Sequence, residues 1–200
     1  MGEFPAERME GLAVPNCERC PALVESRSRI VNGVGPADAD LVFVGEAPGA
    51  DEDAEGGPFV GPSGRVLGQA LRDAGLSRAD VRITNCVRCR PPENRDPHVE
   101  ELENCRGYLA TELARLDPEL IVTLGKVPAE HLLDRDVAVT SEAGDIHDVS
   151  ISGSPQRVML SVHPAATLYD PSQKETFAET LAKAADFTDG ESGQKRLGDF

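Results

Sequence analysis

The chain has 200 residues, 40% of them hydrophobic, which is enough for one well-buried domain and too little for two of ordinary size. Its 35 acidic and 20 basic residues give a net charge of −15, which excludes the broad basic surface that most nucleic-acid-binding proteins use. We therefore expect either a ligand that is not a polyanion or, as we favour, a protein adapted to strong salt, where screening shortens to ~3 Å near 1 M.

No apolar run approaches the roughly 18 residues that cross a membrane, and the N-terminus lacks the basic-then-apolar order of a signal peptide. We expect a cytoplasmic protein with no membrane partner. The chain has five cysteines. An odd number in a reducing compartment indicates metal ligation or free thiols rather than a disulfide framework.

The first recognisable feature is a C-x-x-C pair, Cys17 and Cys20, which follows an irregular arm over residues 1–16. Two cysteines at this spacing can bind one metal ion or one edge of a cluster. Two unrelated exposed thiols so close together would readily oxidise, so ligation is the favoured interpretation. The stretch Ala22–Arg29 predicts a short helix.

The stretch from Leu41 to Gly64 organises the rest of the chain. Leu41–Val44 is an apolar run typical of a buried strand, and glycines and a proline at 45–49 end it abruptly. In an open parallel sheet, ligands bind just beyond the carboxyl ends of the strands. The loop therefore predicts a pocket rim, and the alternative is a long acidic surface loop. Its acidic and aromatic residues are Glu46, Asp51, Glu52, Asp53 and Phe59.

Helices and strands alternate along the remaining chain. Ser63 is expected to cap a helix that ends at Gly75. Residues 134–156 have no clear pattern, and a hairpin is one interpretation. Further strands are predicted at 81–84, 120–124 and 158–162, and further helices at 97–116, 126–133 and 173–187.

This alternation predicts an α/β fold with three layers, α/β/α, around a central, mostly parallel four-stranded sheet. We expect one domain over residues 1–187, acting as a monomer. The polar residues 188–200 predict a disordered tail.

Three predicted strands end in polar side chains, Glu46, Asn85 and His163. Because parallel strands end at the same sheet edge, a carboxylate, an amide and an imidazole are expected to meet there, near Phe59. Each residue alone has a simpler role, such as capping a turn, tying a loop or filling the core. Their joint placement favours a binding pocket.

Cys17, Cys20, Cys89 and Cys105 provide four thiolates that can close a tetrahedral site. Zinc and a four-iron four-sulfur (4Fe-4S) cluster both accept four cysteines, and the spacing does not separate them. Cys86 forms a second C-x-x-C with Cys89, so the residues alone leave the choice between these two open.

Four motifs stand out along the chain: GEAPGADED at 45–53, GGPFVG at 56–61, TNCVRCRPPENRDP at 84–97 and HPAA at 163–166. Together with the cysteine positions, these motifs resemble the family 4 uracil-DNA glycosylases, which carry an iron-sulfur cluster. The resemblance spans roughly residues 11–185 in the right order. In that family the cysteine of the CRPP segment is a ligand, which selects Cys89 and leaves Cys86 as a small buried thiol. The resemblance implies a structural 4Fe-4S cluster on Cys17, Cys20, Cys89 and Cys105 that anchors the N-terminal arm, with zinc as the alternative.

The resemblance also implies a hydrolase that flips uracil out of DNA and cleaves its N-glycosidic bond, leaving an abasic site. Phe59 would stack on the base, and Asn85 would donate to O4 and accept from N3–H, a pairing that cytosine mismatches. His163 would donate to O2 as charge develops on the base. The expected uracil-binding residues are Gly45, Glu46, Ala47, Phe59, Asn85 and His163.

Better-known uracil glycosylases carry an aspartate at the position of Ala47. The resemblance therefore leaves Glu46 or Glu52 to orient the hydrolytic water or to steady the sugar cation. Glu52 can also fill the space near uracil C5 that excludes thymine, because Gly49 is too small to do so.

Family members usually have basic residues near Pro62 and Tyr169 that are absent here. Leu168 is expected to wedge into the vacated stack. A local positive patch is expected from Arg65, Arg88, Arg90 and Arg95.

Two other functions are alternatives for this sequence. One is a noncatalytic iron-sulfur nucleic-acid binder or redox sensor, for which Ala47 and the missing basic residues argue. The other is a glycosylase for a different damaged base such as hypoxanthine, against which Asn85 argues.

Overall fold

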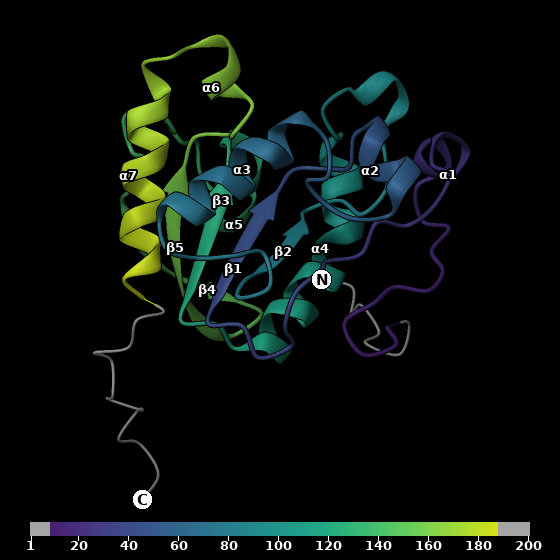
Figure 1. Cartoon of the computed structure of the whole chain (residues 1–200). Coiled ribbons are helices and arrows are strands. Elements are labelled where there is room, and N and C mark those ends of the chain that lie inside the picture. Colours follow the sequence, from purple (N-terminus) through teal and green to yellow (C-terminus); the bar gives the residue numbers. More distant parts are fainter. Residues whose placement is uncertain (1–8, 188–200) are drawn as a thin grey trace, which may run out of the picture.

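A five-stranded mixed sheet forms the centre of the computed structural model, which describes residues 9–187 (Figure 1). The strand order is β2-β1-β3-β5-β4. The first four strands in this order run parallel to their neighbours, and β4 runs antiparallel to β5 at the edge. The tail expected at 188–200 and the start of the arm lie outside the described residues. The strands are β1 (Leu41–Gly45), β2 (Arg82–Asn85), β3 (Leu120–Leu124), β4 (Ile146–Ile151) and β5 (Ser154–Ser161).

The prediction of an α/β fold is confirmed, but the predicted four-stranded sheet is wrong by one strand. The additional strand, β4, lies inside the segment 134–156 and pairs antiparallel with β5, which confirms the hairpin interpretation of that segment. Central strands such as β1 are buried along their whole length and read as apolar runs. The edge strand β4 has no buried residue and mixes polar with apolar side chains, so its sequence gives no such run.

Helices cover both faces of the sheet. On one face, Leu67 and Leu71 of α3 pack with Phe177 of α7 against Phe43 of β1. On the other face, helices α4 and α5 pack against the opposite side of the same strands, through residues such as Leu109 of α4. This gives three layers, α/β/α. The helices are α1 (Pro21–Ser26), α2 (Ala50–Glu55), α3 (Pro62–Asp73), α4 (Val99–Leu116), α5 (Lys126–Leu133), α6 (Ala166–Tyr169) and α7 (Gln173–Ala185), with a 3-10 turn at Pro92–Asn94.

The acidic segment after β1 is partly helical rather than a loop. Helix α2 carries its acidic residues in the first turn, where they complement the positive end of the helix dipole. The buried carboxylate of Asp53 accepts hydrogen bonds from the backbone N–H groups of Ser28 and Arg29, which ties the segment after α1 to α2. Helix α3 begins at Pro62 with Gly61 as its N-cap, so Ser63 is not the cap.

Within residues 9–187, no helix combines the length and the apolar character needed to cross a bilayer.

Candidate active site

The carboxyl ends of β1, β2 and β5 meet at one edge of the sheet and enclose a small cavity. Gly45 and Asn85 are register partners at the ends of β1 and β2, and β5 leads directly to His163. The cavity measures about 100 Å³, well below the roughly 300–1,000 Å³ of pockets that hold drug-sized ligands, so it suits a single small ring. Its lining residues are Glu46, Ala47, Glu52, Phe59, Ser63, Asn85 and His163.

Gly45 lies beneath the cavity, and two pocket side chains rest on its backbone. A Cβ atom at this position would lie 2.4 Å from Oδ1 of Asn85 and 2.6 Å from the ring of Phe59. Only glycine permits such a close approach. The structure therefore brings six of the residues expected at the uracil site, Gly45 included, to one place.

Phe59 forms an aromatic wall of the cavity. Its ring centroid lies 5.9 Å from that of His163, with 35° between the two planes. The residue is 6% exposed, and its φ of 54° lies in the left-handed region, which is unusual for a bulky side chain.

Asn85 presents a complete amide group to the cavity. Although the residue is only 3% exposed, its side chain forms no hydrogen bond with any other residue in the described range 9–187. The amide NH₂ can donate and the amide oxygen can accept, so one side chain can read both a donor and an acceptor on a ring.

His163 is set up as a neutral hydrogen-bond donor. Its Nδ1 atom accepts a hydrogen bond of 3.1 Å from the backbone N–H of Ala165. Burial lowers the pKa of His163, and the charge of Glu52 only partly opposes this. A neutral imidazole whose Nδ1 accepts must carry its proton on Nε2, which leaves Nε2 to donate.

Glu46 is half-buried and has an unusual acid strength. Burial raises its pKa to about 7, and the charge of Asp96 and a hydrogen bond with that carboxyl group add to the effect. Sequence reasoning missed Asp96, because it is distant in the chain and belongs to a segment read only as a family motif. Its one signal is the acidic residue inside ENRDP.

The Glu52 carboxylate accepts three hydrogen bonds from the backbone. Oε1 accepts hydrogen bonds of 3.0 Å from the N–H groups of Val60 and Gly61, and Oε2 accepts one of 3.1 Å from Gly49. Leu168 is not one of the residues that line the cavity; it belongs to α6, at the top of the view in Figure 1, and is 50% exposed.

The expected positive patch needs a correction, because Arg88 is buried. Its guanidinium donates 2.7 Å hydrogen bonds to Glu112 and to Oδ1 of Asn32, and only 2% of the residue is exposed. The fully buried Glu112 requires cationic partners, and Arg82 supplies the second. Arg95 pairs with Glu101 at 2.7 Å. Arg65, exposed on α3, and Arg90 remain from the predicted set.

The four predicted ligand cysteines gather in one apolar cluster with Val14, Leu23, Val87 and Tyr108. They come from the arm, from the segment after β2 and from α4. Cys86 instead packs with Val42 and Leu109 in a different cluster. Burial raises the pKa of the Cys86 thiol far above its usual range, as expected of an inert buried thiol.

Two side chains donate hydrogen bonds to sulfurs of this cluster. Arg27 donates to Sγ of Cys89 at 2.8 Å and to the carbonyl of Cys17 at 2.6 Å, and Asn104 donates to Sγ of Cys20 at 3.5 Å. Burial raises the pKa of the Cys20 and Cys89 thiols, and these hydrogen bonds oppose it, so they favour thiolate over thiol and orient the sulfurs. Four clustered cysteines with these donors fit a group that needs negatively charged sulfur.

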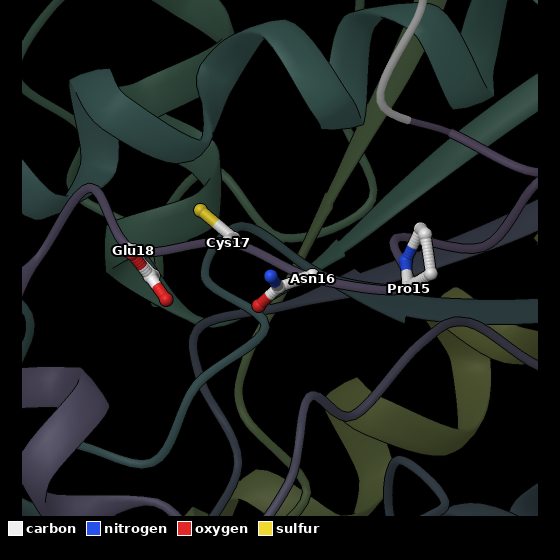
Figure 2. Close-up of a pocket in the computed structure, with 4 residues that line it drawn as sticks. All are labelled: Pro15, Asn16, Cys17 and Glu18. Carbon is white, nitrogen blue, oxygen red and sulfur yellow. The ribbon is translucent and has the colours of Figure 1, made fainter.

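A cavity of about 360 Å³ borders the arm at Pro15, Asn16, Cys17 and Glu18. Figure 2 shows the Cys17 sulfur and the Glu18 carboxylate on opposite sides of this segment. Within residues 9–187, no three His, Cys, Asp or Glu side chains surround a point closely enough to hold a single metal ion.

Comparisons with known proteins agree with this geometry. A family model described as the uracil DNA glycosylase superfamily matches residues 32–185. The chain is 41% identical to a type-4 uracil-DNA glycosylase of Archaeoglobus fulgidus, over 85% of this chain and 87% of that protein. It is 39% identical to the type-4 enzyme of Pyrobaculum aerophilum, over 84% and 88% of the two chains, and 37% identical to that of Thermotoga maritima, over 87% and 90%. The chain therefore belongs to the uracil-DNA glycosylase superfamily and, within it, to the type-4 uracil-DNA glycosylases.

Proposed function

We propose that the protein excises uracil from DNA by hydrolysing the N-glycosidic bond, leaving an abasic site. The observation that carries this proposal is the small cavity in which an aromatic ring, a free amide and a neutral imidazole meet. A cavity of about 100 Å³ accepts one base only after the base has left the duplex stack.

Phe59 and Asn85 recognise the flipped base. The ring of Phe59 stacks on the uracil face, which replaces part of the stacking lost from DNA. The Asn85 amide donates to uracil O4 and accepts from N3–H. Cytosine has an amino group and a bare N3 at these positions, so it would leave a buried donor and acceptor mismatched.

His163 stabilises the departing base. As the bond from C1′ to N1 breaks, its electron pair passes to the uracil ring and negative charge develops on O2. The Nε2–H group of His163 donates to O2, and because the ring is neutral it keeps its proton. A preorganised donor of this kind is typically worth ~3 kcal/mol in the barrier.

Glu46 is the proposed partner of the hydrolytic water. Water attacks C1′ and gives up a proton, which an ionised Glu46 accepts, and the same charge steadies the developing sugar cation. Glu46 is favoured over Glu52 because the Glu52 carboxylate already accepts three backbone hydrogen bonds.

Cys17, Cys20, Cys89 and Cys105 are the residues that would hold a 4Fe-4S cluster, with zinc as the alternative. When bound, the group supplies a rigid tie between the arm, the segment after β2 and α4. Metal analysis and the visible absorbance of the purified protein distinguish the two, since zinc has no such absorbance.

We place the reaction in the cytoplasm, where thiols stay reduced, and expect a monomer.

The test is release of uracil from an oligonucleotide with a single uracil, beside a thymine control, at low and at molar salt. Release at either salt from the uracil substrate alone supports the proposal. If folded protein with its full metal content is inactive at both salts but binds the oligonucleotide, the chain is a noncatalytic nucleic-acid binder.

A further inference from the structure

The backbone of Phe59 is held in a conformation that its side chain disfavours. Its φ is 54°, in the left-handed region where a bulky residue is strained. Such a conformation persists only where the surroundings over-determine it. The contacts of residues 58–61, here called the pocket loop, show what these surroundings are.

Glu52 holds the pocket loop from its N–H side. Its Oε1 atom accepts from both Val60 and Gly61 at 3.0 Å, and its Oε2 atom fixes Gly49 at 3.1 Å. A single carboxylate thus joins the loop that precedes α2 to the loop that precedes α3.

Arg78 holds the pocket loop from its carbonyl side. Its guanidinium donates to the carbonyl of Phe59 at 3.0 Å and to that of Pro58 at 2.8 Å, from a position 19 and 20 residues further along the chain. The side chain is half-buried, and burial lowers the pKa of Arg78 while the charge of Glu52 opposes this. The two charged groups therefore interact across the loop that they hold.

Gly64 of α3 lies directly against the backbone of the same loop. A Cβ atom at this position would lie 1.7 Å from the carbonyl oxygen of Phe59, so the first turn of α3 packs directly on the pocket loop. The Phe59 carbonyl consequently has Arg78 and the α3 backbone as fixed neighbours.

We propose that Glu52 and Arg78 are a pair of positioning residues, which clamp the pocket loop from opposite sides and hold the Phe59 ring where the base must stack. The proposal rests on the proposed function, because the position of the Phe59 ring matters only if a base stacks on it. It gives Glu52 a role different from activating water, and it gives a role to Arg78, which no sequence motif singles out.

Hydrogen exchange tests the clamp without any assay of activity. The amide protons of Val60 and Gly61 should be protected in the wild-type protein, because Glu52 accepts from both. We expect faster exchange in a peptide covering residues 58–64 for Glu52→Ala and for Arg78→Gln. Glu52→Gln should keep most of the protection, because one carbonyl oxygen can still accept both bonds. The matched control is Arg72→Gln, which removes an exposed arginine of α3 whose side chain, within residues 9–187, donates a hydrogen bond to Gln69 alone.

Single-turnover uracil release at saturating DNA then separates positioning from catalysis. Displacement of a substrate-positioning group by about 1 Å can cost on the order of 100-fold, so we expect Glu52→Ala and Arg78→Gln to slow the chemical step between about tenfold and 100-fold. Glu52→Gln should recover to within about threefold of wild type, since its amide oxygen retains the two bonds from the pocket loop, from Val60 and Gly61, without the charge. Arg72→Gln should match wild type.

Two results would overturn the clamp. The first is unchanged exchange at residues 58–64 in Arg78→Gln together with a wild-type rate. The second is a Glu52→Gln variant as slow as Glu52→Ala despite normal exchange, which would make the charge of Glu52 essential in the chemistry. If wild-type protein releases no uracil, the proposed function fails, and the exchange data still decide whether the clamp exists.

Discussion

Burial shifts the acid strength of two pocket side chains in opposite directions. It raises the pKa of Glu46 to about 7, aided by Asp96, and it lowers the pKa of His163. At neutral pH the imidazole is therefore uncharged, while the carboxyl group is divided between its two forms. This difference separates a neutral donor from a titrating acceptor within one small cavity.

The rate of uracil release should follow the ionisation of Glu46. We expect the single-turnover rate to rise with pH through about 7, because only the ionised carboxylate accepts a proton from water. Asp96→Asn removes a neighbouring negative charge, so the midpoint of the profile should move to lower pH. A profile that stays flat from pH 5 to pH 9 in the wild-type protein would exclude Glu46 as the base.

The same carboxyl group should make stability depend on pH. Its folded-state pKa of about 7 lies above the ordinary value of 4.5, so the native state binds more protons between these values. The free energy of unfolding attributable to Glu46 should therefore fall as pH rises from about 4.5 to about 7. Glu46→Gln should remove this slope in urea titrations and be more stable than wild type at pH 8. Equal slopes in both proteins would contradict the shifted pKa.

At the scale of elements, a buried ion network joins β2, α4 and the segment between α1 and β1. Glu112 of α4 receives hydrogen bonds from Arg82 and Thr84 of β2 and from Arg88, which also donates to Asn32. Since Arg88 directly precedes Cys89, the network also fixes the segment that carries this cysteine.

Removing the central carboxylate of this network should destabilise the protein. We expect Glu112→Ala to lower the free energy of unfolding by about 3–5 kcal/mol, because it leaves two buried guanidinium groups without their counter-ion. Glu119→Ala, which breaks an exposed pair with Arg157, is the control and should cost less than about 1 kcal/mol. Equal losses of unfolding free energy in urea denaturation would show that the buried network contributes no more to stability than the exposed pair.

The side chains that donate hydrogen bonds to the cysteine sulfurs also join separate elements. Arg27 follows α1 and reaches Cys89 beyond β2, while Asn104 of α4 reaches Cys20. In Arg27→Gln the positive donor is lost, so a bound 4Fe-4S cluster should be bleached faster by a chelator and have a more negative reduction potential. Arg135→Gln, which alters an exposed pair with Glu142, should leave both unchanged. If Arg27→Gln also leaves both unchanged, the bond to Cys89 does not act on the cluster.

For the whole molecule, the charge of −15 opposes binding to another polyanion. Two of the four arginines expected to offset it, Arg88 and Arg95, are already engaged by Glu112 and Glu101. We therefore expect uracil release under subsaturating DNA to speed up from about 0.1 M to about 1 M KCl, as screening removes the repulsion. A rate that falls steadily with salt, as for ordinary DNA-binding proteins, would contradict a salt-adapted surface.

Sequence reasoning reached those parts of the fold and site that depend on local pattern. The apolar run of β1 and the helical spacing in α4 reflect burial that repeats along one element. It indicated a hairpin in the segment 134–156 but did not delimit β4 or add it to the sheet, because an edge strand buries too few residues to produce an apolar run. The prediction that Arg88 lies on the surface was wrong, because its burial depends on a counter-ion, Glu112, that lies 24 positions away in the chain.

The residues in order were enough to predict the alternation of strands and helices, the polar residues at the strand ends and the family. Each of these depends on residues close together in the chain or on motifs read in order. The folded chain was needed to find that Asp96 acts on Glu46, that His163 carries its proton on Nε2 and that Arg78 meets Phe59. This is because acid strength, tautomer and backbone strain are set by neighbours in space, and folding brings those neighbours from distant parts of the chain.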